Sequence, residues 1–415
     1  MSLIRAFAGL RPVDGRAGDV CAPPYDVLNS AEARSRAEGR PYSFLHISKP
    51  EIDLPEDTNP YAPEVYAKAA ENFQRMRQEG VLVQDEQPCY YIYRLHMDDH
   101  TQTGLVAVAS VEDYDSNRIR KHEFTRPDKE DDRVRQIDAL DAQTGPVLLA
   151  YRSEAEVDAL LEAGASGAPD VDIVADDGIG HKLWVVRDQK LIDDITARFD
   201  AMPNLYIADG HHRSASASRV AAARREANPN HTGEEPYNYF LSVIFPHEQM
   251  AIFDYNRVVK DLNGKSPEEF MDTVGKAFEV APSEVPVKPA GPAEFGMYLG
   301  GKWYRLNIRE DLIPKDDPVK RLDVSLLADN LLDPVLGITD PRRDSRIDFV
   351  GGIRGLDGLQ KRVDSGEMVV AFSMYPTPMS ELMAVADAGE VMPPKSTWFE
   401  PKLADGLVSH LLESR

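Results

Sequence analysis

The chain has 415 residues, of which 42% are hydrophobic and 28% charged, a composition typical of folded globular proteins rather than disordered ones. Its 70 Asp and Glu residues exceed its 47 Lys and Arg residues, and the resulting net charge of -23 repels nucleic-acid backbones, so no nucleic-acid partner is expected. With two cysteines, no signal-peptide pattern and no apolar run of about 18 residues, the sequence predicts a cytoplasmic protein that makes no membrane contact.

Helices and strands alternate through the expected elements of the first 200 residues. Ser30 is expected to cap a helix that runs to Glu38, and a strand is expected over 42–47. A helix over 64–79 should end at Gly80, and paired strands should follow at 90–96 and 103–111. The remaining expectations are strands at 118–124, 147–151, 172–174 and 182–187, a charged helix ending near residue 140, and helices at 154–163 and 188–199.

A short apolar strand over 205–208 is followed by a small-residue helix that runs to about residue 226. The later pattern predicts strands at 239–245 and 251–258, a helix at 267–278, a hairpin around residues 300–301, a helix at 323–332 and a strand at 369–375. This length and order predict a mixed α+β fold with two domains, a phosphate-binding catalytic domain at 1–260 and an α/β domain at 261–415.

The segment Asp209-Gly210-His211-His212-Arg213 carries the clearest chemical signal. Gly210 permits a tight turn and close approach of a ligand, and the following helix N-terminus offers unpaired N–H groups and partial positive charge to an anion. Arg213 adds a guanidinium fork for phosphate oxygens, and His211 and His212 can donate to the same oxygens. Asp209 would hold a magnesium ion or orient a reacting hydroxyl group. The segment therefore predicts a phosphate site.

Two other interpretations of this segment stay open. In the first, Asp209 caps the helix and the two histidines only satisfy local hydrogen bonds. In the second, the histidines bind zinc; because adjacent helical residues point about 100° apart, such a site would require a third ligand from elsewhere in the chain.

A second polar segment, Lys121-His122-Glu123, lies at the end of the expected strand 118–124. A strand end lets a loop present Glu123 to a site, whereas the acidic residues of the next helix are expected to form a solvated face. Lys121 or Arg120 would neutralise a transferring phosphate.

Several motifs together resemble the family known as domain of unknown function 1015, and they cover both ends of the chain. The Asp209–Arg213 segment in turn resembles the ParB/sulfiredoxin superfamily and, within it, the free L-serine kinases, which make O-phosphoserine. The resemblance implies a mixed-sheet, ParB/sulfiredoxin-like nucleotide-binding domain, ATP or ADP with Mg²⁺ as cofactors, and a catalytic glutamate at Glu123. The matching segments are residues 22–27, 41–46, 121–127, 209–213 and 392–399.

Substrate contacts are expected from three further places. Tyr25 and Asp26 follow two prolines in a rigid turn that could line a pocket, and Thr144 belongs to a Thr-Gly-Pro element that the family resemblance places near the same site. Lys395 and Ser396 suit a phosphate or carboxylate, if the second domain packs over the first.

The sequence thus predicts a small-molecule kinase that transfers phosphate from ATP or ADP to free L-serine. Its catalytic residues would be Glu123, Asp209 and His211, with Gly210, His212, Arg213 and Lys121 binding the nucleotide. The alternatives are a nucleotide-dependent switch, a phosphometabolite-binding protein without turnover, and a metal hydrolase. The expected partners are a nucleotide and a small hydroxyl metabolite, and a homodimer is left open.

Overall fold

In the computed structural model, which describes residues 2–413, the chain divides into a first unit, Met1–Met250 with Pro401–Arg415, and a second unit, Ala251–Glu400. This division differs from the expected one, which placed the boundary at 260 and assigned all of 261–415 to the second domain. The difference arises because residues 401–413 pair with residues 10, 22 and 142–143 of the first unit, so backbone hydrogen bonds decide their membership.

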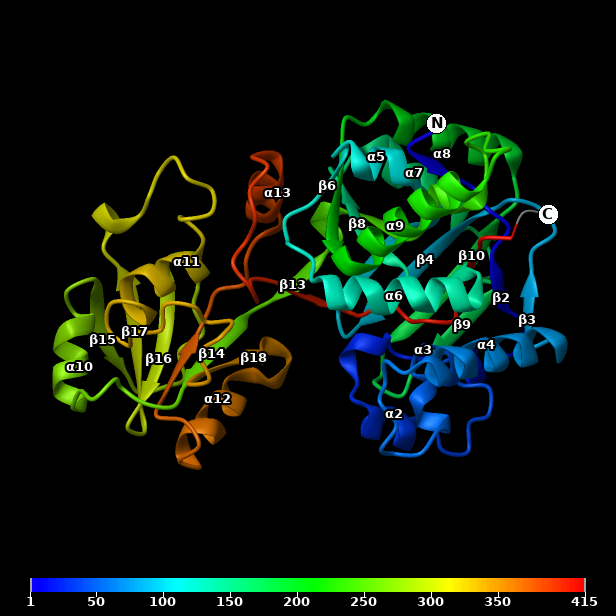
Figure 1. The fold of residues 1–415 in the computed structure, drawn as a ribbon. Helices are drawn as coiled ribbons and strands as arrows, with labels where there is room; N and C mark the ends of the chain where they lie inside the picture. The colour runs from blue at the N-terminus through cyan, green and yellow to red at the C-terminus, as the bar shows by residue number, and fades with distance from the viewer. Residues whose placement is uncertain (1, 414–415) are drawn as a thin grey trace. The chain divides into compact units, whose positions relative to one another are not determined.

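A nine-stranded mixed sheet forms the centre of the first unit (Figure 1). The order is β6-β11-β8-β12-β5-β4-β10-β9, and β1 also pairs with β5. The β6–β11 and β8–β12 pairs are parallel, and all other pairs are antiparallel. The strands are β1 (Ile4–Arg5), β4 (Tyr90–Met97), β5 (His100–Ser110), β6 (Ile119–Arg120), β8 (Val147–Tyr151), β9 (Val171–Val174), β10 (Gly180–Val186), β11 (Leu205–Asp209) and β12 (Tyr239–Pro246).

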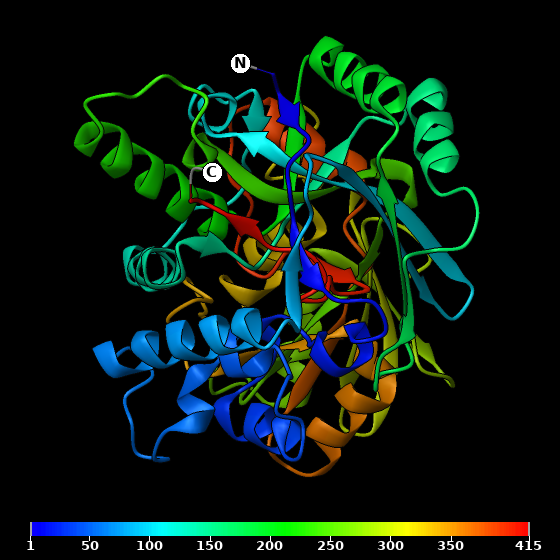
Figure 2. The same ribbon diagram turned by 90° about the vertical axis from the view of Figure 1, so that its right-hand side faces the viewer.

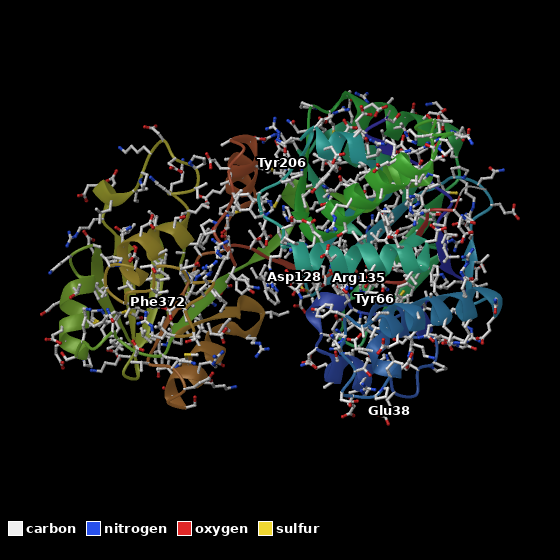
Figure 3. All side chains as sticks on the ribbon, in the orientation of Figure 1. Glu38, Tyr66, Asp128, Arg135, Tyr206 and Phe372 are labelled. Carbon is white, nitrogen blue, oxygen red and sulfur yellow. The ribbon has the colours of Figure 1, made fainter. Side chains whose placement is uncertain are left out.

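Helices pack on this sheet through a core of buried aliphatic and aromatic side chains. The helices α6 and α9 lie side by side in Figure 1, and α4 packs against α6. The Tyr66 hydroxyl on α4 donates to Asp132 on α6 at 2.6 Å; Figure 3 labels Tyr66 together with Asp128 and Arg135 of α6. The longer helices are α2 (Ser30–Ala37), α4 (Pro63–Gln78), α6 (Pro127–Leu140), α7 (Ala155–Gly164), α8 (Gln189–Ala201) and α9 (His211–Ala227).

The C-terminal segment returns to the first unit and lies beside its N-terminal strands (Figure 2). The strand β21 (His410–Leu411) pairs with β7 (Ala142–Gln143), and backbone hydrogen bonds join Ser409 to Leu10 in both directions. A further bridge joins Asp405 to Ala22. The register of these pairs brings Asp405 and the residues after β7 into the same region.

The second unit has a six-stranded antiparallel sheet in the order β15-β17-β16-β19-β14-β18. Phe372 on β19, labelled in Figure 3, is fully buried in this unit. The strands are β14 (Tyr255–Val259), β15 (Phe278–Ser283), β16 (Glu294–Leu299), β17 (Lys302–Ile308), β18 (Ile347–Gly351) and β19 (Val370–Ser373), and the helices include α10 (Pro267–Val274), α11 (Asp323–Leu327), α12 (Gly355–Asp364) and α13 (Met379–Asp387).

Three local expectations are wrong. Residues 42–47 form no strand, because the apolar run enters the short helix α3 (Leu45–Ser48), and short apolar runs do not distinguish a strand from a buried helical turn. The strand expected over 118–124 is limited to Ile119–Arg120. Asn29, not Ser30, caps α2, because its side chain accepts from the Glu32 N–H while the Glu32 carboxylate accepts from the Asn29 N–H.

Within residues 2–413, no helix combines the length and the apolar character that crossing a membrane requires.

Candidate functional site

Two neighbouring parallel strands bring the polar segments of the sequence together. Leu205 and Tyr206 of β11 pair in parallel with Ile119 and Arg120 of β6, so both strands end at the same edge of the sheet. The residues that follow β6 and the residues that follow β11 therefore meet, although 89 positions separate His122 from His211. Ligands bind at the carboxyl ends of parallel strands in many α/β proteins, and this edge is the candidate site.

The turn at Gly210 requires glycine for two reasons. Its backbone is left-handed, with φ 97° and ψ 28°, a conformation that side chains with a Cβ disfavour. A Cβ at this position would also lie 3.3 Å from the Cα of Val147 at the start of β8. The Gly210 N–H donates to Asp209 Oδ1 at 2.8 Å, which fixes the turn between strand and helix.

The N-terminus of α9 has backbone N–H groups that the helix itself leaves without an acceptor. No side chain caps it, and the N–H groups of Arg213 and Ser214 already donate to the Gly210 carbonyl. The N–H groups of His211 and His212, in the first helical turn, have no intrahelical acceptor, and no other acceptor for them lies within residues 2–413. Such a terminus stabilises an anion.

His211 joins this helix terminus to Glu123. Its Nε2 accepts from the His122 backbone N–H at 3.3 Å, and its Nδ1 lies 3.6 Å from Glu123 Oε2. Burial lowers the pKa of His211 well below 6.5, helped by the positive charges that His122, His212 and Lys121 would carry, so its ring is neutral. Because Nε2 accepts, the hydrogen-bond pattern assigns the proton to Nδ1, which faces the carboxylate.

His122, Glu123 and His211 each offer one ligand atom within 4.8 Å of the others, a grouping that could hold a metal ion. Burial also lowers the pKa of His122 to about 4 and leaves its ring neutral. A metal on His211 Nδ1 would, however, move the proton to Nε2 and break the hydrogen bond from the His122 N–H. The adjacent His212 does not join the group, since its Nε2 accepts from the Arg126 N–H at 3.1 Å.

Asp209 is the residue expected to bind Mg²⁺. Its Oδ1 accepts from Gly210, and its Oδ2 lies 3.8 Å from Lys402 Nζ, with the side chain 44% exposed. One accessible carboxylate fits the way Mg²⁺ is commonly held, by one or two carboxylates together with substrate phosphates and water. Asp209 fits such an ion only when a nucleotide supplies the remaining ligands.

Lys121, expected at the phosphate, points elsewhere. Its Nζ donates to the Tyr114 carbonyl at 2.8 Å and lies 3.9 Å from the centre of the Tyr114 ring. Burial lowers the pKa of Lys121. The side chain would have to swing away from Tyr114 to meet a phosphate, so its role in phosphate binding stays a prediction.

Arg213 is directed away from the helix terminus. Its guanidinium donates to the Pro146 carbonyl at 2.8 Å and to Asp26 Oδ2 at 2.7 Å, and it lies 5.3 Å from the centre of the Tyr25 ring. Burial alone would lower the pKa of Arg213, but Asp26 and Tyr25 raise it, so the group stays charged. The expected grip on phosphate stays a prediction, and the guanidinium in this arrangement is already paired.

A small cavity of about 40 Å³ adjoins Arg213. Tyr25 and Thr144, both predicted substrate residues, line it, and so does Asp405, which the sequence did not indicate. Asp405 is only 2% exposed, and burial raises its pKa to about 7, Asp26 adding to the effect and Arg213 opposing it. The missed signal was the segment 407–412 after Gly406, in which four of six residues are Leu or Val; such a segment favours a buried strand and therefore a buried approach to it.

Lys395 and Ser396 lie in the second unit, and their expected contact with substrate stays a prediction. The Lys395 carbonyl accepts from Arg257 at 3.0 Å, and its backbone is left-handed with φ 59°. The Ser396 hydroxyl donates to the Pro393 carbonyl, so both residues help to shape the 393–396 turn.

In a comparison with known protein families, residues 4–325 match the family described as "Protein of unknown function (DUF1015)". No curated protein sequence matches the chain. Among solved structures, a conserved hypothetical protein from Pyrococcus furiosus is similar at 14% identity and a TM-score of 0.35, covering 73% of this chain and 94% of that one. A free serine kinase in complex with AMP is similar at 13% identity and a TM-score of 0.36, covering 73% and 92%. SbnI from Staphylococcus aureus, with a C-terminal truncation, is similar at 12% identity and a TM-score of 0.37, covering 73% and 86%.

Proposed function

The chain belongs to the family described as protein of unknown function (DUF1015), and from the geometry of its own residues we propose that it is a phosphotransferase. It would move a phosphate from ATP or ADP to the hydroxyl group of a small amino acid, most simply free L-serine. The proposed first unit is a ParB/sulfiredoxin-like nucleotide-binding domain. Nucleic acid is not a proposed partner, because the net charge of -23 repels it.

One observation carries the proposal. The uncapped N-terminus of α9 and the Glu123 carboxylate both lie at the carboxyl ends of the parallel strands β6 and β11. The N–H groups of His211 and His212 offer donors for phosphate oxygens, and Glu123 lies 3.6 Å from the His211 ring. Phosphoryl transfer needs charge stabilisation and a positioned acceptor for the hydroxyl proton more than it needs covalent chemistry. The two features supply those two requirements.

In the proposed step, the serine hydroxyl oxygen attacks the terminal phosphorus of the nucleotide. A new O–P bond forms, the bond to the bridging oxygen breaks, and ADP (from ATP) or AMP (from ADP) leaves with the electron pair. The hydroxyl proton passes to the Glu123 carboxylate, whose Oε2 lies 3.6 Å from His211 Nδ1. Because burial lowers the pKa of His211 well below its usual value, its ring would not compete with Glu123 for the proton.

The remaining polar groups take supporting roles in this proposal. Asp209 would hold Mg²⁺ with the nucleotide phosphates, and the ion would neutralise their charge. Gly210 lets the phosphates approach the backbone, and His212 would donate from its ring. Lys121 would neutralise the transferring group after leaving Tyr114.

The direct test is mass spectrometry of the full-length protein incubated with Mg²⁺, L-serine and either ATP or ADP. The proposal predicts phosphoserine from at least one donor and none from the Glu123→Gln variant. Binding of either nucleotide without transfer to serine or to any other hydroxyl amino acid would refute the kinase function.

A further inference from the structure

A second set of residues on α9 faces a different environment from Glu123. Successive helical residues turn by about 100°, so His211 and Arg213 point to nearly opposite sides of the helix. Arg213 extends into the cavity of about 40 Å³, whose polar lining residues include Tyr25, Ser48, Arg133, Thr144 and Asp405. At roughly 10–15 Å³ for each enclosed water, this space holds about three waters or the polar end of a small metabolite.

Three buried polar atoms of the cavity lining have no hydrogen-bond partner in the protein. They are Ser48 Oγ, Arg213 Nε and Asp405 Oδ1. Buried polar groups in folded proteins are nearly always paired, with protein, water or a ligand. Their concentration around one cavity indicates that a polar occupant completes it.

Gly145 creates the space between two of these atoms. A Cβ built on Gly145 would lie 3.6 Å from Arg213 Nε and 3.8 Å from Asp405 Oδ1. The Arg213 donor and the Asp405 acceptor thus face the same open volume, although they do not bond to each other. An occupant there meets one hydrogen-bond donor and one carboxylate.

The charges around the cavity are balanced between both signs. The guanidinium groups of Arg133 and Arg213 lie 3.8 Å and 5.3 Å from the centre of the Tyr25 ring, and the carboxylates of Asp26 and Asp405 belong to the same cluster. Burial alone would raise the pKa of Asp26, but Arg213 and Lys402 lower it, whereas the pKa of Asp405 is raised to about 7. Burial thus outweighs the Arg213 and Arg133 charges at Asp405, whose buried Oδ1 accepts no hydrogen bond from the protein.

We infer that this cavity binds the head group of an α-amino acid, with its carboxylate on Arg213 Nε–H and its ammonium on Asp405 Oδ1. The inference goes beyond the proposed function, because this cavity and Glu123 lie on nearly opposite sides of α9, so a head group held in the cavity would not present a hydroxyl to Glu123. It adds the residues that would select an amino acid over other hydroxyl compounds: Asp405, Gly145 and Ser48. The ammonium supplies a donor to Asp405 Oδ1, and the carboxylate supplies an acceptor to Arg213 Nε.

Calorimetric titration with L-alanine tests this inference separately from catalysis, because L-alanine has the head group but no hydroxyl to phosphorylate. We expect L-alanine to bind, and L-lactate, which lacks the ammonium, to bind at least about 10-fold more weakly. Gly145→Ala and Asp405→Asn should each weaken L-alanine binding at least about 10-fold. Ser48→Ala should have a smaller effect in the same direction.

Two matched controls separate binding from folding. Gly291, in the second unit, has an ordinary φ and open space around it, so Gly291→Ala should leave L-alanine binding unchanged. Asp323, also in the second unit, is buried with an unpaired Oδ2 and a pKa raised to about 7, so Asp323→Asn repeats the chemistry of Asp405→Asn without touching the cavity.

Equal binding of L-alanine and L-lactate, absence of L-alanine binding, or binding unaffected by both Gly145→Ala and Asp405→Asn would each overturn the inference. Failure of the proposed function looks different. L-alanine binding that depends on Asp405, without phosphoserine formation from L-serine, would refute the kinase and leave the head-group site. Phosphoserine formation from L-serine without measurable L-alanine binding would do the reverse.

Discussion

The two faces of the first turn of α9 differ in whether their charged groups are exposed to water or buried. On the His211 face, two neutral imidazoles are buried and the Glu123 carboxylate is 56% exposed. On the Arg213 face, a guanidinium and the Asp405 carboxylate are both withdrawn from water. One turn of helix therefore separates a face where charge stays at the solvent from a face where charge is enclosed.

This difference matches two kinds of chemistry. A group that exchanges a proton during turnover works best when solvation keeps its ionised form accessible. A group that recognises a fixed charge gains from a low dielectric, provided that the opposite charge arrives with the ligand. The comparison predicts that changes on the His211 face alter the rate, whereas changes on the Arg213 face alter stability and ligand affinity.

The largest expected effect is on the His211 face. Glu123→Gln removes the proton acceptor and should lower kcat by about 10²–10⁴-fold, with nucleotide affinity nearly unchanged. Steady-state kinetics and nucleotide titration measure both quantities. Glu112→Gln, an exposed change in the first turn of α5 (Val111–Asp115), serves as the control and should leave kcat unchanged. A kcat for Glu123→Gln within twofold of wild type would remove the functional distinction between the faces.

On the opposite face, Arg213→Met should reduce the free energy of unfolding by about 2–4 kcal/mol. The substitution leaves Asp26 and the Pro146 carbonyl without their donor, although Asp26 is 43% exposed and water compensates part of the loss. Urea denaturation followed by circular dichroism measures the change. The free energy of unfolding of Arg213→Lys should lie between those of Arg213→Met and the wild type, because lysine keeps the charge but not the two-pronged contact.

The pH dependence of Asp405→Asn gives a sharper test of the enclosed charge. A folded-state pKa of about 7, against an ordinary 3.8, means that the stability associated with protonated Asp405 is present below pH 3.8 and lost as pH rises through 7. The asparagine side chain does not titrate, so the variant lacks this dependence of stability on pH. The variant should therefore exceed wild type in unfolding free energy by about 2 kcal/mol at pH 8, and the gap should close toward pH 4. A gap that does not vary with pH would show that Asp405 is ionised throughout.

The smallest effect is expected at Gly210, which both faces share. Gly210→Ala forces a Cβ into a left-handed residue beside Val147 and should lower stability by about 1 kcal/mol. It should also weaken nucleotide binding, because phosphate approaches the backbone there. Gly389 has a similar positive φ and nothing within 4 Å of its virtual Cβ. Gly389→Ala should thus introduce the same backbone strain and lower the stability measured by thermal unfolding, while leaving nucleotide affinity intact.

The sequence was informative where structure depends on neighbouring residues. The apolar strand, Gly210 and the small-residue helix after it predicted the strand-turn-helix unit, and β11 and α9 confirm it. The contact between Glu123 and that turn depends on the parallel pairing of β6 with β11. This pairing cannot be inferred from the sequence of either segment alone. The contact was therefore reached through motif resemblance rather than through local pattern.

The direction of Arg213 and the place of Asp405 needed long-range information. Arg213 is held by Asp26, 187 positions away, so its residue type alone gave no reason to point it away from a phosphate. Asp405 enters the cavity because β21 pairs with β7, which directly precedes Thr144. A sequence read in chain order assigned that tail to the second domain, since pairing across so large a separation leaves no local trace.

The return of residues 401–413 to the first unit also orders events during synthesis. Asp405 and the strand that pairs with β7 emerge from the ribosome only after the whole of Ala251–Glu400. At about 5–20 residues per second, the first unit waits on the order of ten seconds for its last strand. During that interval the edge of β7 has no partner from the tail, so the nascent chain is exposed to mispairing and to chaperones until the final segment closes it.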